Sequence, residues 1–470
     1  MNSRRRFLKT ASAAGLLGAS GLMPALSAFP AHAADTTGYK ALVCVFLLGG
    51  MDCHDTLLPY DQASYDRYAE IRAPLMQLYA GQPSGSSRDR SRLLELIPDN
   101  DADFGGRRFA LPEHMSGIKG LFDSGSAAIV SNVGPLSEPL TKTEWDNQSA
   151  NTPKRLFSHN DQQSTWMSSQ PEGAQFGWGG RFADAVYNSG GVTDSTFLTI
   201  TSLGNELFLT GDVTQAFQVG TGGPSELEIL KFYEGFRGTP DGEEMYQRMR
   251  DHFEAMDFNR SNLIERDIAA AMNGAIQTNE LFKEAIDQKT DFSALFPPNF
   301  LGQQLRSVAE TISVRGLLGK PRQIFFVAIG GFDTHSNQAT DLPGLHTEID
   351  TGVTAFYESL VQMGLTSDVT LFTASDFGRT LAVNGDGTDH GWGSHHFVVG
   401  DAVAGRNIFG DVPPYDFGHD YDAGSGRLIP STSVEQFAEP MGRWFGLNDT
   451  ELLAALPNLG SFSAPSLTFV

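Results

Sequence analysis

The chain has 470 residues, of which 33 are basic and 56 are acidic, and its formal net charge at pH 7 is −23. This acidity argues against nucleic acid or an anionic membrane surface as a partner, because both repel a negatively charged protein. The two cysteines, Cys44 and Cys53, are too few for a disulfide framework. The length fits two or three average domains, but it also fits one large α/β domain with insertions.

Residues 1–33 are predicted to form a signal peptide. A basic start at Ser3–Lys9 precedes a weakly apolar stretch at Thr10–Met23, and the cleavage-site pattern Ala31-His32-Ala33 follows, with small residues at its first and third positions. The arginines followed by Phe-Leu-Lys resemble a twin-arginine (Tat) signal, and the alternative is a Sec signal that contains an arginine cluster. We therefore expect the Tat export machinery as a partner and a periplasmic or secreted location. No later segment has the length and apolarity of a transmembrane helix.

Three apolar segments predict strands that are buried on both faces, and each is followed closely by an aspartate. The segments and their acids are Ala41–Leu48 with Asp52, Ile324–Ile329 with Asp333, and Val369–Ala374 with Asp376. A glycine pair precedes each of the first two acids and lets the backbone turn sharply and approach a ligand closely. Ligands of open α/β sheets bind beyond the carboxyl ends of the parallel strands, so these acids are expected to converge in one crevice.

The other predicted elements complete an α/β pattern. In chain order they are helix Leu111–Asp123, strands Ala127–Val130, Thr196–Ile200 and Glu206–Leu209, a helical stretch at Ser225–Gln288, helix Leu345–Leu365, strand His396–Val399 and helix Ser431–Phe445. The helix between the second and third acid-bearing strands completes a β-α-β unit. We predict that residues 34–470 form one α/β domain, with a mostly parallel sheet flanked by helices and a helical insertion at about residues 225–300.

The acids and the nearby histidines predict a divalent metal site. The candidate ligands are Asp52, Asp333, His335, Asp376 and His390, with His395 as the second choice after His390. Carboxylate oxygens and imidazole nitrogens form the ligand set of catalytic divalent metals, and Asp389 could orient an imidazole without binding the ion. Taken singly, each aspartate could instead cap a helix or close a turn, which is common at such positions.

Two further side chains are candidates for a catalytic role. Arg379 follows the third acid, and a guanidinium beside a metal suits a phosphate or sulfate group, although a structural salt bridge is the alternative. Ser158 could be a nucleophile and His159 another ligand. The same segment could instead cap the start of a helix before Trp166.

Several motifs together resemble the domain-of-unknown-function 1501 family. They are Gly49–Asp52, Ser158–Trp166, Gly330–Gln338, Asp376–Thr380 and Gly387–Gly391. That family resembles the alkaline phosphatase and sulfatase superfamily, whose members hold one or two metals at the strand ends of a mostly parallel sheet. The resemblance implies metal-binding roles for Asp52, Asp333 and Asp376, and for either His390 or His395.

The sequence departs from the superfamily pattern at two metal positions. Phe377 stands where a histidine ligand is usual, and the partner that follows Asp333 is either His335 or Asn337. Neither cysteine lies in a Cys-x-Pro-x-Arg motif, so a sulfatase with a formylglycine nucleophile is not expected.

The expected function is exported, metal-dependent hydrolysis of phosphate or sulfate esters, with a small anionic molecule as the substrate. The cofactor is a divalent metal, and zinc, manganese, iron, magnesium and calcium all stay open. There are two alternatives. One is a protein of the same fold that binds a metal and an anion without catalysis, and the other is a structural envelope protein that holds calcium.

Overall fold

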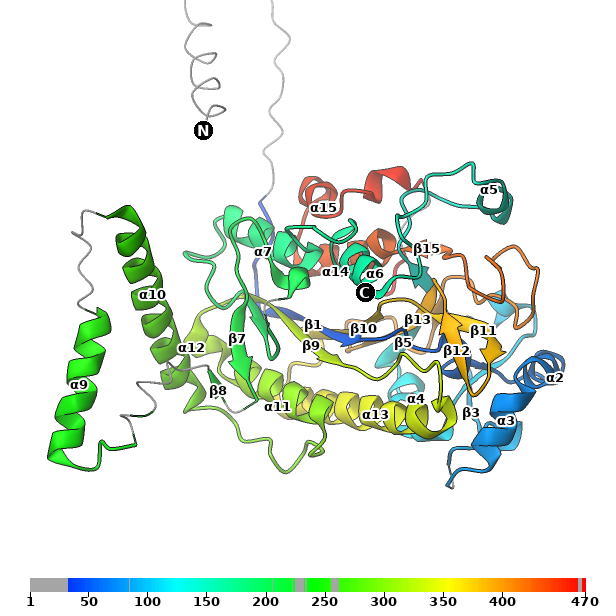
Figure 1. Ribbon diagram of the computed structural model, residues 1–470, viewed down its shortest axis with the longest axis horizontal. Coiled ribbons are helices and arrows are strands. Elements are labelled where there is room, and N and C mark those ends of the chain that lie inside the picture. The colour runs from blue at the N-terminus through cyan, green and yellow to red at the C-terminus, as the bar shows by residue number, and fades with distance from the viewer. Residues whose placement is uncertain are drawn as a thin grey trace, which may run out of the picture. The chain divides into compact units, whose positions relative to one another are not determined.

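The computed structural model describes residues 33–83, 85–204, 206–221, 223–224, 232, 235–254, 262–463 and 467–470 (Figure 1). The predicted Tat signal peptide therefore lies outside the described residues, apart from Ala33. Among the described residues, no helix is both long enough and apolar enough to cross a membrane.

A large mixed sheet forms the centre of the fold, and most of its strand pairs are parallel. Its order is β14-β5-β13-β10-β1-β9-β6-β7-β8, and β15 pairs with β5. The strands are β1 Lys40–Leu47, β5 Ala127–Gly134, β6 Thr199–Thr201, β7 Phe217–Gly220, β8 Gly223–Pro224, β9 Arg322–Ile329, β10 Val369–Ser375, β13 Ser394–Val399, β14 Ile408–Phe409 and β15 Thr432–Ser433. Strand β13 is antiparallel to both of its neighbours, β10 and β5.

The three acid-bearing strands lie side by side, as predicted. Strand β1 pairs in parallel with β9 on one side and with β10 on the other. Its last residue, Leu47, stands opposite Ile329 of β9 and Ser375 of β10, so the three strands end at the same level. The turns that follow them therefore share one edge of the sheet, where parallel α/β sheets bind ligands.

Helices cover both faces of the sheet, and two small sheets stand beside it (Figure 1). The helices are α2 Gln62–Ile71, α3 Ala73–Ala80, α4 Ser116–Asp123, α5 Lys142–Asn147, α6 His159–Ser168, α7 Trp178–Asn188, α9 Pro240–Glu254, α10 Leu263–Ile286, α11 Phe300–Ser313, α12 Arg315–Leu318, α13 Gln338–Met363, α14 Val434–Phe445 and α15 Asp449–Ala455. The small sheets are the hairpin of β11 Arg379–Asn384 with β12 Gly387–His390, and the group of β2 Leu58–Pro59, β4 Phe109–Leu111 and β3 Leu94–Leu96.

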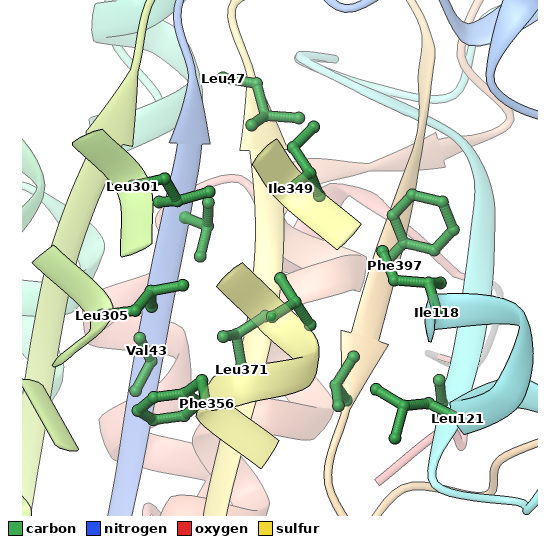
Figure 2. Packing of buried hydrophobic residues seen from close by; sticks show 14 of the residues in the cluster. Val43, Leu47, Ile118, Leu121, Leu301, Leu305, Ile349, Phe356, Leu371 and Phe397 are labelled. Atoms are coloured by element: carbon green, nitrogen blue, oxygen red, sulfur yellow. The ribbon is translucent and has the colours of Figure 1, made fainter. Parts of the chain in front are cut away.

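Strand β1 is buried on both faces because its side chains alternate between two hydrophobic clusters. Val43 and Leu47 face one cluster, which α4, α11 and α13 cover (Figure 2). Cys44 and Phe46 face the other, to which α6, α7 and α14 contribute. Burial of each large apolar side chain stabilises the fold by about 1.5–3 kcal/mol, so this strand is anchored from both sides. Both cysteines are free thiols and buried.

Most predicted elements are present, although their ends have moved. Helix α13 begins at Gln338, before the predicted start at Leu345, because the helix accommodates Pro343. The predicted strand at Glu206–Leu209 is wrong, since Leu207–Leu209 forms a 3-10 helix. Phe208 and Leu209 are buried outside the sheet, where the Phe208 ring packs edge-on against Trp178 with centroids 4.6 Å apart.

The segment predicted to be a helical insertion contains α9 and α10. Asn262 caps the start of α10 by accepting a hydrogen bond from the main-chain N–H of Ile264. Residues 225–231, 233–234 and 255–261 of this segment lie outside the described residues.

His396 of β13 is a buried imidazole whose ring packs against Trp166 and Phe437. Neither of its ring nitrogens has a hydrogen-bond partner among the residues that the structure describes. Burial lowers the pKa of His396 to about 3. As the pH falls below about 6.5, His396 therefore becomes protonated in the unfolded chain but stays neutral in the folded protein. This difference lowers the free energy of unfolding.

We expect His396→Leu to become more stable relative to the native chain as the pH is lowered. Between pH 7.5 and pH 5 its free energy of unfolding should gain about 2 kcal/mol over that of the native chain. Urea unfolding at the two pH values measures this difference. Parallel pH profiles for the two proteins would contradict the assigned state of His396.

Candidate metal centre

The turns after β1 and β9 touch each other. The N–H of Leu48 donates to the carbonyl of Ile329 at 2.9 Å, and the N–H of Phe332 donates to the carbonyl of Leu48 at 3.2 Å. Gly49 has a φ of +114°, and a Cβ at this position would collide with the main-chain nitrogen of Asp333. The glycine therefore lets the second acid settle directly over the end of the first strand.

The carboxylate of Asp333 stands among three imidazoles and one guanidinium. Its Oδ1 is 3.1 Å from Nε2 of His390, 3.2 Å from Nε2 of His335 and 2.7 Å from Nη1 of Arg379. Its Oδ2 is 3.5 Å from Nε2 of His159. These side chains come from the turn after β9, from the β11–β12 hairpin and from the first residue of α6. Segments far apart in sequence thus meet at one carboxylate.

An oxygen faces the other nitrogen of each of these three imidazoles. Nδ1 of His390 is 2.8 Å from the carbonyl of Phe157, and Nδ1 of His159 is 2.7 Å from Oδ2 of Asp376. Nδ1 of His335 is 3.4 Å from Oδ1 of Asp389. A carbonyl or carboxylate oxygen only accepts, so these contacts favour a proton on Nδ1, whereas the contacts of Nε2 with Asp333 favour a proton on Nε2 until an ion replaces it. Metal-bound histidines are oriented in this way.

The Nε2 atoms lie close enough to share one ion. One ligand atom each from His159, Asp333 and His390 lie within 4.8 Å of one another. Nε2 of His335 is only 2.8 Å from Nε2 of His390. Two lone pairs at this distance repel unless a proton or a metal ion lies beside them. Imidazole nitrogens with one carboxylate suit a four-coordinate zinc-type ion, so the residues fit a metal.

The surroundings favour the metal-binding forms of Asp333 and His390, but not that of His159. Burial alone would raise the pKa of Asp333, but the hydrogen bond and charge of Arg379 outweigh it and the pKa is lowered. Burial lowers the pKa of His390, which favours its neutral ring. His159 differs, because its hydrogen bond to Asp376 raises its pKa. His159 therefore keeps a second proton to higher pH than an ordinary histidine does, and a metal ion must displace that proton in order to bind.

Asp376 lies behind His159. Its carboxylate is buried, and Oδ2 accepts from Nδ1 of His159, from Nε2 of Gln163 at 2.8 Å and from the N–H of Gly49 at 3.2 Å. The predicted ligand Asp376 thus contacts the candidate centre through His159, and it fixes which nitrogen of that ring is free.

Asp52 does not join this group, although it was a candidate ligand. The turn continues into a 3-10 helix at Cys53–Asp55 that directs the carboxylate inward, to a buried ion pair with Arg72 at 2.5 Å. Nε2 of Gln338 also donates to Asp52, at 2.7 Å. The charge of Asp52 is therefore neutralised within the protein.

His395 is also placed away from the group around Asp333. It lies in β13, where Nδ1 accepts from the N–H of Asn132 at 3.0 Å and is 3.0 Å from Oγ of Ser131. Burial lowers the pKa of His395 to about 3, so the ring is neutral. Of the two histidines considered for the last ligand, the structure brings His390 to Asp333.

Arg379 is fully buried, and protein atoms surround its guanidinium. Besides Asp333, it donates to the carbonyl of Gly49 at 3.1 Å and to both the carbonyl and Oγ1 of Thr388. The salt bridge that sequence analysis offered as the alternative role of Arg379 is present. This guanidinium orients Asp333 and has no free edge for a substrate.

The hydroxyl of Ser158 donates to Oδ2 of Asp161 at 3.1 Å, whereas the next residue, His159, contacts Asp333 and Asp376. From the sequence, His159 was predicted only as a further possible ligand and was left out of the main candidates. The signal that could have ranked His159 higher is Gln163, which follows one helical turn later. The side-chain amide of Gln163 donates to the carboxylate of Asp376.

Phe377 was noted in the sequence as a departure from the pattern that the resemblance implies. Its ring packs against His159 and His390, with centroids 4.8 and 4.6 Å away. Between the two residues considered to follow Asp333, the imidazole of His335 reaches the carboxylate. Asn337 occupies the N-cap position of α13 without a capping hydrogen bond from its side chain, and its N–H donates to Asp386 at 2.9 Å.

These observations define an α/β protein with a histidine and carboxylate group at the carboxyl edge of its parallel strands. The chain belongs to the family described as "Protein of unknown function (DUF1501)", whose family model matches residues 39–457. The resemblance drawn from the sequence motifs is thereby confirmed at the family level. No curated protein matches the chain.

Two solved structures show a distant likeness. The crystal structure of Ps i-CgsB in complex with k-i-k-neocarrahexaose is 9% identical, with a TM-score of 0.33, and the match covers 88% of this chain and 74% of that chain. The crystal structure of Ps i-CgsB is 10% identical, with a TM-score of 0.32, and the match covers 90% and 77%. TM-scores this low do not bear on the function of this chain.

The geometry predicts that zinc binding depends on Asp333 and, less strongly, on Asp376. Asp333→Asn should weaken zinc binding by more than about 100-fold, and Asp376→Asn by about 10- to 100-fold, because the latter only releases His159. Isothermal titration with zinc measures both changes.

Asp416→Asn is the matched control, since Asp416 is also paired with an arginine and is exposed to a similar extent, 49% against 46%. Its zinc affinity should equal that of the native chain. Native zinc affinity in folded Asp333→Asn would contradict this placement of the ion.

Proposed function

We propose that this protein binds a divalent transition metal at His159, Asp333 and His390, with His335 as a fourth side chain, and hydrolyses phosphate or sulfate esters. The observation that carries the proposal is the orientation of the imidazoles. Each ring has its Nδ1 beside an oxygen acceptor and turns its Nε2 towards Asp333. The sheet and the position of the site at its strand ends support an alkaline-phosphatase-like architecture.

The donor set favours a transition metal over calcium or magnesium. Both of those ions prefer ligand sets made of oxygen, whereas this group offers imidazole nitrogens and one carboxylate. Zinc, manganese and iron accept such mixed sets. The donor set therefore supports a catalytic or metal-binding role over a structural calcium site.

When bound, the ion would polarise the ester oxygen and lower the pKa of a water molecule. The chain's own residues prepare the site for it. Arg379 holds Asp333, Asp376 holds His159, and the ring of Phe377 packs against both flanking imidazoles. Hydrolysis then consumes one water and releases an alcohol and the free phosphate or sulfate.

Water is the proposed nucleophile, because the hydroxyl of Ser158 is bonded to Asp161. Ser158→Ala should keep metal binding and turnover, and it should lose only the stability of one hydrogen bond, about 0.5–1.5 kcal/mol. Steady-state kinetics and urea unfolding measure the two quantities. Abolished turnover with unchanged metal content would instead assign Ser158 as the nucleophile.

The proposed location is the periplasm or the exterior of the cell, reached through the Tat machinery. The sequence of residues 1–33 supports this. Export in the folded state would also permit the metal to be loaded before translocation.

The direct test is ester hydrolysis by the purified protein, loaded in turn with zinc, manganese and iron. We expect turnover of p-nitrophenyl phosphate or p-nitrophenyl sulfate that a chelator abolishes and added metal restores. His390→Gln should lower kcat/KM by more than about 100-fold, whereas the control Asp416→Asn should not change it. Metal binding without turnover of either ester would favour the alternative of a non-catalytic binding protein. A protein that binds no transition metal would refute the proposal.

A further inference from the structure

An anionic substrate needs a cationic partner besides the metal, and Arg379 is not suited to that role. Its side chain is fully buried, and its donors are directed to Asp333, Gly49 and Thr388. A substrate could reach this guanidinium only by displacing internal hydrogen bonds. A positive side chain that meets the substrate would therefore be another residue.

Arg427 lies beside the candidate metal centre, where it contacts the main chain of His390 and the ring of Phe157. Its Nε donates to the carbonyl of His390 at 2.8 Å, and its guanidinium carbon lies 5.3 Å from the centre of the Phe157 ring. Phe157 is the residue whose carbonyl faces Nδ1 of His390. Arg427 thus contacts both His390 and Phe157, the residue whose carbonyl faces the imidazole of His390.

The guanidinium of Arg427 is fixed at one end and open at the other. Nη1 donates to the carbonyl of Gly424 at 3.1 Å, while Nη2 makes no hydrogen bond within the part of the chain that the structure describes. The side chain is only partly buried. A planar guanidinium with a free edge is well suited to an oxygen of a phosphate or sulfate group.

The loop that carries Arg427 is itself tied down. The carboxylate of Asp422 accepts from the N–H groups of Gly418, Gly424 and Gly426 at 2.7–2.8 Å. The N–H of Ala423 donates to the carbonyl of Arg427 at 2.8 Å. Such a loop holds a binding group in place before the substrate arrives, which lowers the entropic cost of binding.

We propose that Arg427, and not Arg379, binds the anionic group of the substrate beside the metal. This proposal rests on the proposed function of the site. The competing role for Arg427 is to position His390, through the main-chain carbonyl that it holds. The two roles predict different effects when the guanidinium is removed. If Arg427 positions His390, the affinity for the metal falls. If Arg427 binds the substrate, only the affinity for the anion falls.

The test compares Arg427→Gln with Arg406→Gln in the full-length protein. Arg406 is a matched control because its Nε also donates to a main-chain carbonyl, that of Ile97 at 3.1 Å, and it is partly exposed. Zinc affinity is measured first. Inorganic phosphate, and separately sulfate, is then titrated into the zinc-loaded proteins after free zinc has been removed.

We expect Arg427→Gln to bind zinc as the native chain does and to bind phosphate or sulfate about tenfold more weakly or worse, the loss of one charge-assisted hydrogen bond. Arg427→Lys should fall between the two, because it keeps the charge but not the planar fork. Arg406→Gln should match the native chain in both titrations.

Three results would overturn the assignment of Arg427. These are unchanged anion affinity in Arg427→Gln, a joint loss of zinc and anion binding in that variant, and a zinc-loaded native chain that binds neither anion. A native chain that does not bind zinc would instead refute the proposed function, so the zinc titration separates the two failures.

Discussion

The in-register parallel pairing of β1 with both β9 and β10 is the constraint on which the candidate centre depends. This pairing ends the three strands at the same level, so the turns that follow them are packed closely together. Gly49 resolves the tightest contact, because any side chain there would collide with the main chain of Asp333. Burial of β1 on both faces keeps this register fixed, since a slip by one residue would exchange the side chains of two hydrophobic clusters.

A series of hydrogen bonds through buried side chains leads to the exposed carboxylate of Asp333. It runs from Arg72 to Asp52, Gln338, Thr388, Arg379 and Asp333. The first and second strand-end acids are therefore linked, one as a buried support and the other as the group presented to an ion. In a low-dielectric interior such a network is stable only when every member has a partner, and removal of one member leaves a neighbouring charge uncompensated.

The sequence predicted the sheet and the strand ends well, because short buried strands and glycine turns are local signals. It also predicted that Asp333, His335 and His390 are candidates for one site, and the structure brings them together. Asp52 could not be placed from the sequence, since Arg72 reaches it from a helix whose packing is a tertiary property. For the same reason His159 was predicted only as a further possible ligand, because its neighbours Asp333 and Asp376 are distant along the chain.

The proposed metal centre requires an ion among His159, Asp333 and His390. A zinc-soaked crystal measured at the zinc absorption edge can locate this ion. We expect one strong anomalous peak about 2.0–2.2 Å from Nε2 of His159 and His390 and from a carboxylate oxygen of Asp333. A structure in which these Nε2 atoms still surround Asp333 with no peak among them, or in which zinc binds elsewhere, would contradict the proposed metal centre.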